Sequence, residues 1–128
     1  MVKKILLVDD DVYIRDLYAE VLKDENYDIT IAADGEEALS LVEDDSFDLI
    51  LLDIMLPKLD GIQVLAKIKE DPARKSIPVI MLTNFGQEDL VKQAVTLGCS
   101  EYLLKYNLTP GEIITKVAQI LNPKEVKL

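Results

Sequence analysis

Residues 49–61 read LILLDIMLPKLDG, and this stretch decides the fold class that we expect. Its first four residues are continuously apolar rather than alternating, which predicts a strand buried on both faces, as in a parallel sheet. Asp53 ends the apolar run, and Asp60 lies three residues before Gln63, the spacing of a capping box at the start of a helix. A buried strand that leads through a carboxylate into a helix is a repeating unit of α/β proteins.

The same unit recurs along the chain, because short apolar runs alternate with stretches in which apolar residues recur at helical spacing. The expected strands lie at residues 5–8, 29–32, 49–52, 79–82 and 102–104. The expected helices have their apolar faces within residues 14–22, 38–42, 64–68, 90–95 and 113–121. Right-handed crossovers favour a flavodoxin-like (βα)5 three-layer sandwich with a parallel sheet in the order 2-1-3-4-5. We expect one domain over residues 1–122 and a short polar tail or linker stub at 123–128.

Composition excludes several classes of function. The 128 residues include 24 Asp and Glu against 14 Lys and Arg, and the net charge of −10 disfavours binding to nucleic acid or anionic lipid. The chain has no histidine, which excludes a histidine-based catalytic triad and a phosphohistidine of its own. A single cysteine, Cys99, permits no internal disulfide and favours a reducing, cytoplasmic location. No apolar run approaches the length of a membrane span.

Polar residues follow four of the expected strands. They are Asp9, Asp10 and Asp11 after the first strand, Asp53 at the end of the third, Thr83 and Asn84 after the fourth, and Lys105 after the fifth. These strands are adjacent in the expected order, so their polar residues should converge at one edge of the sheet. Two carboxylates about 4 Å apart repel by about 4 kcal/mol at an effective dielectric near 20, and such a cluster therefore favours a bound cation.

The expected cluster offers only hard oxygen ligands for such a cation. Ligands of this kind, without His or Cys, favour Mg²⁺, with Mn²⁺ as a substitute. Mg²⁺ usually takes one or two carboxylates and completes its coordination with water and phosphate. Because phosphoryl transfer depends mainly on positioning and charge neutralisation, the cluster indicates phosphoryl chemistry.

Each of these residues also has an ordinary structural interpretation. The acidic triplet at residues 9–11 is typical of a helix cap, and we expect one of its members to cap the first helix. Thr83 alone suits a helix cap, and Lys105 alone suits a solvated loop. A surface turn is a weaker interpretation for Asp53, because a charge at the end of a buried strand carries a desolvation cost. The functional interpretation therefore depends on the convergence of four strand ends.

From about Lys3 to Leu121, the chain resembles the receiver domain of two-component response regulators. The resemblance is carried by LVDD at residues 7–10, LDIMLPKLDG at 52–61, PVIMLT at 78–83 and EYLLK at 101–105. These motifs occur in order and at the spacings of the family. The resemblance implies a stand-alone signalling switch that is activated by phosphorylation, and not an enzyme, with only slow self-dephosphorylation.

The resemblance also implies roles for the residues of the cluster. Asp53 would accept a phosphoryl group from the phosphohistidine of a partner kinase. Asp9, Asp10 and Asp53 would hold Mg²⁺ together with the backbone carbonyl of Met55. The implied partners are a sensor histidine kinase or phosphotransfer protein and a downstream protein effector, without direct contact of this chain with nucleic acid or membrane. The implied state is a monomer, with dimerisation on phosphorylation left open.

The resemblance also implies that three residues respond to phosphorylation of Asp53. Lys105 and Thr83 would contact the phosphoryl oxygens, and Thr83 would be the switch hydroxyl that is drawn to the phosphoryl group. Tyr102 would be the aromatic switch residue and would turn inward as Thr83 moves. The responding surface would be the fourth helix, the fifth strand and the fifth helix.

Two positions depart from the pattern of the family. Tyr106 stands where the family usually has a proline with a cis peptide bond, and we expect a trans bond because a cis non-proline bond costs about 3–4 kcal/mol. The loop after Lys105 could then take another path. Asn84 stands where the family usually has a small residue, which would alter access to the phosphoryl group and its lifetime.

Three alternative functions remain to be weighed. An aspartyl-nucleophile phosphohydrolase needs an acid/base carboxylate two residues after its nucleophile, and Met55 occupies that position. A flavin or nucleotide carrier needs a Gly-rich or Ser/Thr-rich phosphate loop after the first strand, and the acidic triplet at residues 9–11 would repel phosphate. A phosphorylation-silent receiver used as a docking module stays open because of Tyr106.

Overall fold

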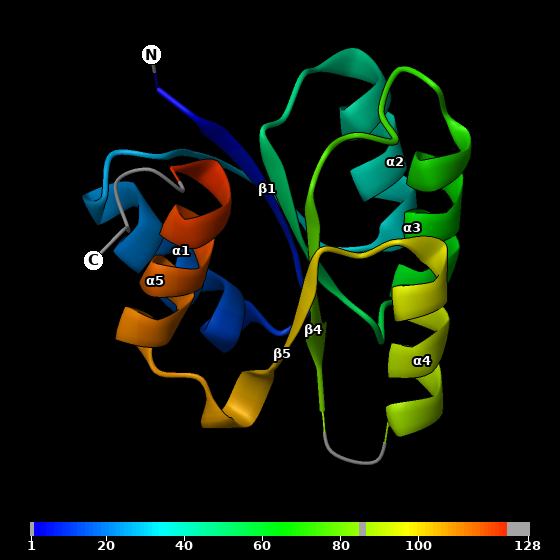
Figure 1. Ribbon diagram of the computed structural model, residues 1–128. Coiled ribbons are helices and arrows are strands. Elements are labelled where there is room, and N and C mark those ends of the chain that lie inside the picture. The colour runs from blue at the N-terminus through cyan, green and yellow to red at the C-terminus, as the bar shows by residue number, and fades with distance from the viewer. Residues whose placement is uncertain (1, 85–86, 123–128) are drawn as a thin grey trace.

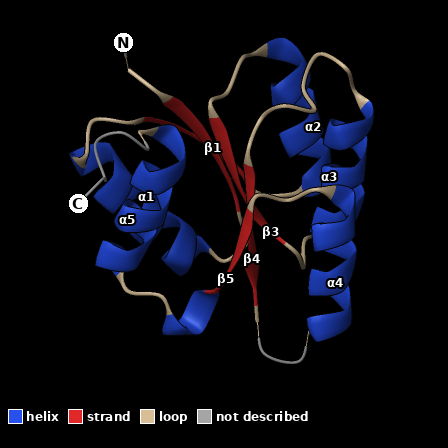
Figure 2. Ribbon diagram, viewed as in Figure 1, coloured by secondary structure: helices blue, strands red, loops and turns tan. Residues whose placement is uncertain are grey.

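A central sheet of five parallel strands organises the chain, for which a computed structural model describes residues 2–84 and 87–122 (Figures 1 and 2). The strands are β1 (Lys4–Val8), β2 (Asp28–Ala32), β3 (Leu49–Asp53), β4 (Val79–Thr83) and β5 (Glu101–Leu104). They pair in the order β2-β1-β3-β4-β5, which confirms the predicted topology. The tail or linker stub predicted at residues 123–128 lies outside the described residues.

Helices cover both faces of the sheet. They are α1 (Val12–Asp24), α2 (Gly35–Asp44), α3 (Gly61–Glu70), α4 (Glu88–Leu97) and α5 (Pro110–Leu121), with a short 3-10 helix η1 (Lys105–Asn107) after β5. Figure 1 shows α1 and α5 together on one face and α2, α3 and α4 on the other. The result is the three-layer α/β sandwich predicted from the alternating pattern.

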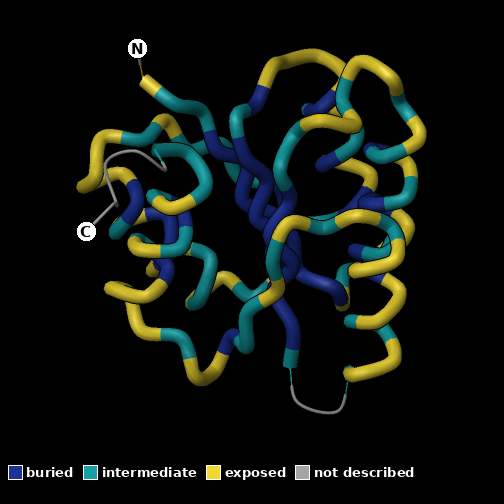
Figure 3. The backbone as a smooth tube through the Cα atoms, viewed as in Figure 1, coloured by how far each residue is buried: buried dark blue, intermediate teal, exposed yellow. Residues whose placement is uncertain are grey.

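The continuous apolar runs form strands that are buried on both sides. In β3, Leu49 and Leu51 pack against the layer of α1 and α5, while Ile50 and Leu52 pack against the layer of α2, α3 and α4. Every residue of β3 and β4 is buried, and the middle of the sheet is the most buried part of the backbone in Figure 3. Because both faces of these strands contact apolar layers, apolar and polar residues do not alternate along them, and their sequences are unbroken apolar runs.

Polar residues cap most of the described helices, including the two starts that the sequence predicts, at Asp60 and within the acidic triplet. Asp11 is the member of the acidic triplet that caps α1, and Asp34 caps α2 by accepting from the backbone N–H of Glu37. Asp60 and Thr109 each form a reciprocal capping box at the starts of α3 and α5. At its other end, α4 finishes on Gly98 with a φ of +99°, a conformation that glycine adopts without strain.

Parallel pairing brings the carboxyl ends of the strands to one edge of the sheet. Asp53, the last residue of β3, pairs with Leu82 of β4, and Thr83, the last residue of β4, pairs with Leu104 of β5. The described residues contain no cis peptide bond, so the trans bond expected at Tyr106 is confirmed. None of the described helices has the length and apolar character needed to cross a membrane.

Candidate functional site

Four polar or charged residues are buried within residues 2–84 and 87–122, and all four belong to the predicted cluster. They are Asp9, Asp53, Thr83 and Lys105, and the exposed fractions of the whole residues, side chain and backbone together, are 0%, 3%, 2% and 5%. They stand just after β1, at the ends of β3 and β4, and just after β5. The solvated loop suggested by Lys105 alone and the helix cap suggested by Thr83 alone are therefore wrong, and the convergence of strand ends is confirmed.

The Lys105 ammonium bridges two buried carboxylates. Its Nζ donates to Asp53 Oδ2 at 3.1 Å and to Asp9 Oδ1 at 3.1 Å. The second oxygen of Asp9, Oδ2, lies 3.0 Å from Nζ as an ion pair but has no hydrogen bond among the described residues. Two buried negative charges thus share one positive charge, and the group keeps a net negative charge without solvent to disperse it.

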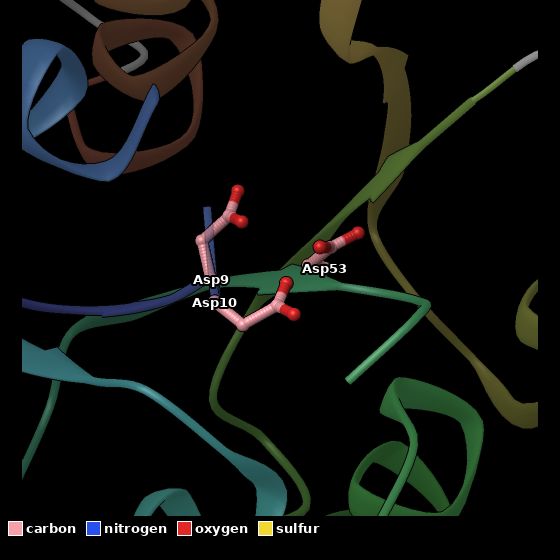
Figure 4. A group of neighbouring side chains, drawn as sticks. All are labelled: Asp9, Asp10 and Asp53. Atoms are coloured by element: carbon pink, nitrogen blue, oxygen red, sulfur yellow. The ribbon is translucent and has the colours of Figure 1, made fainter. Parts of the chain in front are cut away.

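A third carboxylate borders this pair from the solvent side. Asp10 is exposed, and one ligand oxygen each from Asp9, Asp10 and Asp53 lie within 4.8 Å of one another (Figure 4). Asp53 Oδ1 is buried and has no hydrogen-bond partner among the described residues. A buried acceptor without a donor is costly, and a hard cation would satisfy it. The donor set and this unpaired oxygen therefore fit Mg²⁺ or Mn²⁺.

The surroundings of the cluster raise the pKa values of both Asp53 and Lys105, the two partners of its central ion pair. Burial, and next the charge of Asp9, raise the pKa of Asp53 to about 7, against the opposing effect of Lys105. The pKa of Lys105 is raised, because its contacts with Asp9 and Asp53 outweigh the desolvation that alone would lower it. Lys105 is therefore fully charged at neutral pH, while the Asp53 carboxyl lies close to its own titration.

Gly61 allows the start of α3 to approach the end of β3 closely. A Cβ placed on Gly61 would lie 2.2 Å from the Asp53 carbonyl oxygen and 2.8 Å from the Ile54 Cα. The Gly61 backbone N–H donates to the Ile54 carbonyl at 2.7 Å, which closes the turn after β3. Only glycine allows this approach, so the Asp60-Gly61 pair of the sequence motif serves the geometry at Asp53 as well as the start of α3.

The backbone of Lys105 is held by a residue that sequence reasoning did not assign to the site. The Tyr18 hydroxyl, buried on α1, donates to the Lys105 carbonyl oxygen at 3.2 Å. Burial is the largest effect on the Tyr18 hydroxyl and raises its pKa. The sequence places Tyr18 on the apolar face of the first helix, and nothing in the local pattern indicates a partner 87 residues away.

The hydroxyl of Thr83 also has a partner that the sequence did not reveal. Thr83 Oγ1 lies 2.9 Å from Gln87 Oε1, and the same Gln87 oxygen lies 2.8 Å from the backbone nitrogen of Asn84. A cavity of about 390 Å³ adjoins this group and is also lined by Tyr102 and Leu104. Tyr102 is 46% exposed, so its ring lies largely outside the core in this arrangement.

Comparison with known proteins agrees with the fold. The family model described as the response regulator receiver domain matches residues 5–118. The chain therefore belongs to the receiver domains of two-component response regulators, whose general role is that of a phosphorylation switch. Receiver domains of this family interact with histidine kinases and are signalling switches.

Two curated relatives come from Bacillus subtilis (strain 168). The alkaline phosphatase synthesis transcriptional regulatory protein PhoP is 40% identical over 98% of this chain and 51% of its own length. The transcriptional regulatory protein ResD is 41% identical over 92% of this chain and 48% of its own length. The chain thus spans about half the length of the curated relatives it matches.

Solved structures show the same architecture. A CheY-like response regulator receiver domain protein from Methanospirillum hungatei JF-1 has a TM-score of 0.89 and 31% identity, with 98% of each chain covered. The Mn²⁺-bound form of the response regulator Rcp1 has a TM-score of 0.82 and 34% identity, covering 94% of this chain and 95% of its own.

Proposed function

We propose that this domain is a switch in which Asp53 accepts a phosphoryl group from the phosphohistidine of a histidine kinase or phosphotransfer protein. One observation carries the proposal. Asp53 is a buried carboxylate at a strand end, with Lys105 Nζ at 3.1 Å from Oδ2 and with Oδ1 lacking a partner among the described residues. One of its oxygens is thus paired with the Lys105 ammonium, and the other has no competing hydrogen bond among the described residues.

The transfer is a substitution at phosphorus. An oxygen of the Asp53 carboxylate forms a bond to phosphorus while the phosphorus–nitrogen bond of the donor breaks, and the donor imidazole keeps the electron pair and takes up a proton. Lys105 contacts the phosphoryl oxygens and offsets the charge that they bring into the cluster. The chain has no histidine, so the donor belongs to another protein or another part of a longer one.

A divalent cation completes the site in this proposal. Asp9, Asp10 and Asp53 would hold Mg²⁺ together with the backbone carbonyl of Met55, and Mn²⁺ would substitute for it. When bound, the ion neutralises charge on the carboxylates and on the incoming phosphoryl group. The proposal is supported by the three oxygens within 4.8 Å and by the similarity to Rcp1, whose structure was solved in a Mn²⁺-bound form.

Phosphorylation would change the surface formed by α4, β5 and α5. The Thr83 hydroxyl would move to contact the phosphoryl oxygens, and Tyr102 would turn toward the space that Thr83 leaves. The cavity of about 390 Å³ supports this step, because Thr83, Tyr102 and residues of α4 all line it. A local charge would thus shift an element with two arrangements.

The alternative functions are less well supported. A phosphohydrolase would need a carboxylate where the half-exposed, uncharged Met55 stands, so only slow self-dephosphorylation is proposed. A phosphorylation-silent docking module would follow if Tyr106 displaced Lys105, but Lys105 reaches both carboxylates with a trans bond at Tyr106. The switch therefore remains the proposal.

We place the switch in the cytoplasm, where it would act through protein contacts. The domain itself is strongly acidic, which disfavours contact with DNA or anionic membranes. PhoP and ResD are named as transcriptional regulatory proteins and are about twice as long as this chain. A role in transcription would require an output module elsewhere in a longer protein or in a partner.

Amide chemical shifts test the switch directly. Acetyl phosphate added with Mg²⁺ should shift the backbone signals of Thr83, Tyr102 and α4, and the same addition to Asp53→Asn should leave them unchanged. Exposed residues of α2, on the far side of α3 from α4, serve as the internal reference. Shifts confined to the neighbourhood of Asp53, or equal shifts in the variant, would contradict the proposed switch.

A further inference from the structure

The side chain of Gln87 lies at the start of α4 but does not cap that helix. Gln87 occupies the N-cap position, yet none of the first helical N–H groups donates to its side chain. Its Oε1 instead accepts from the backbone N–H of Asn84 at 2.8 Å and contacts Thr83 Oγ1 at 2.9 Å. The side chain therefore serves the end of β4 rather than the stability of α4.

The Asn84 contact settles which atom of the Gln87 amide faces Thr83. A backbone N–H only donates, so the atom that meets it must be the Gln87 oxygen and not the amide nitrogen. In the contact between these two side chains, the Thr83 hydroxyl therefore donates and Gln87 Oε1 accepts. Among the described residues, the other hydrogen-bond contact of this hydroxyl is with the Asn84 carbonyl at 3.3 Å, which is also an acceptor.

The Thr83 hydroxyl has a single proton, and that proton is engaged. Thr83 is 2% exposed, so water cannot readily replace the Gln87 oxygen as its acceptor. Phosphoryl oxygens accept hydrogen bonds, and Thr83 can reach them only as a donor. The bond from Thr83 to Gln87 must therefore break before Thr83 can donate to a phosphoryl group on Asp53.

We propose that Gln87 is a positioning residue that stabilises the unphosphorylated arrangement by holding the Thr83 hydroxyl. The proposal rests on the proposed function, in which Thr83 contacts the phosphoryl group. Gln87 lines the same cavity as Thr83 and Tyr102, so releasing the hydroxyl also alters the space that Tyr102 faces. The residue at this position thereby sets how strongly the switch resists activation.

The test compares the affinity for beryllofluoride, a stable phosphoryl analogue, in the presence of Mg²⁺ by calorimetry. Gln87→Met keeps the length of the side chain but removes the acceptor, and should bind the analogue about fivefold more tightly, the value of one ordinary hydrogen bond. Gln87→Glu retains acceptor oxygens and should bind no more tightly than the wild type. Gln93→Met makes the same exchange at an exposed position of α4 and should have no effect.

A double-mutant cycle separates this role from a purely structural one. Thr83→Val removes the hydroxyl, so adding Gln87→Met to it should no longer tighten binding. The lost Asn84 contact is common to both backgrounds and cancels in the cycle. The affinity for Mg²⁺ alone should also stay the same in Gln87→Met, because Gln87 contacts none of the carboxylates of the cluster in the described structure.

The outcomes distinguish this inference from the proposed function. A wild-type chain that neither binds beryllofluoride nor takes up a phosphoryl group would contradict the function itself. A wild-type chain that binds the analogue with the same affinity as Gln87→Met would overturn only the role of Gln87. Equal tightening with and without the Thr83 hydroxyl would likewise show that Gln87 does not act through Thr83.

Discussion

Lys105 Nζ lies 3.1 Å from Asp53 Oδ2, and the two side chains are 3% and 4% exposed. The contact joins the residue after β5 to the last residue of β3 across the intervening strand β4. Asp9 adds a second buried carboxylate to the same ammonium. The pair therefore connects the stability of the sheet edge with the chemistry proposed for Asp53.

Removing Lys105 should destabilise the metal-free domain strongly at alkaline pH. Lys105→Met leaves two buried carboxylates without a cation, and breaking a buried pair in this way costs about 3–5 kcal/mol. The free energy of unfolding in urea at pH 8 measures the effect. Lys116→Met is the matched control, because its contact with Glu101 at 3.3 Å is more than a third exposed and should contribute less than about 1 kcal/mol. Equal losses in the two variants would contradict this interpretation.

The raised pKa of Asp53 predicts how the stability of the metal-free protein depends on pH. The pKa is about 7 in the folded state and 3.8 ordinarily, so the folded state binds the proton more tightly between these values. The contribution of Asp53 is thus most favourable below pH 4 and is lost as the pH rises through 7. Asp53→Asn lacks this loss, and its stability relative to the wild type should increase by an amount of the order of 4 kcal/mol between pH 4 and 8.

Urea unfolding of both proteins in EDTA at several pH values measures that difference. Other titrating groups are common to both proteins and largely cancel. The free energy of unfolding of Asp53→Asn minus that of the wild type should rise with pH. If this difference stayed constant or decreased as the pH rises, the pKa of Asp53 would not be raised in the folded state.

Divalent metal should stabilise the folded domain through the acidic cluster. A ligand at ten times its dissociation constant stabilises the folded state by about 1.4 kcal/mol, which raises the melting temperature of a domain of this size by roughly 5 °C. Asp10→Asn should weaken the response to Mg²⁺, whereas Asp16→Asn on the exposed side of α1 should not. A melting temperature that stays flat up to tens of millimolar Mg²⁺ argues against the site.

Tyr18 should support the backbone that presents Lys105. Tyr18→Phe removes the hydroxyl that donates to the Lys105 carbonyl, whose other contact, the Leu108 N–H at 3.4 Å, is long. The expected loss in the free energy of unfolding is about 1 kcal/mol. Tyr13→Phe, at an exposed position of the same helix, should change it by less than about 0.5 kcal/mol. Indistinguishable variants would mean that the Tyr18 hydroxyl contributes nothing.

The parts of the fold that the sequence predicts are those set by local patterns. Continuous apolar runs identify β3 and β4 because both faces are buried, and the capping residue Asp60 identifies the start of α3 because its side chain bonds within four residues. The cluster of Asp9, Asp53 and Lys105 follows from topology, since parallel strands bring their carboxyl ends to one edge.

The contacts that the sequence does not predict depend on side-chain direction. Tyr18 has the spacing of a core residue, and only the packing of α1 against the sheet shows that its hydroxyl reaches Lys105. Gln87 stands before the apolar face of α4 like any polar helix-start residue, and its side chain could equally have capped that helix. No local signal in the sequence distinguishes that cap from the contact with Thr83 that the structure shows.

The most direct test of the central claim is the intact mass of the domain after incubation with acetyl phosphate. The account predicts one phosphoryl adduct on the wild type with Mg²⁺, little or none with EDTA, and none on Asp53→Asn. An adduct that forms equally well on Asp53→Asn, or a wild-type chain that takes up no phosphoryl group from acetyl phosphate with Mg²⁺, would contradict the assignment of Asp53 as the phosphoacceptor.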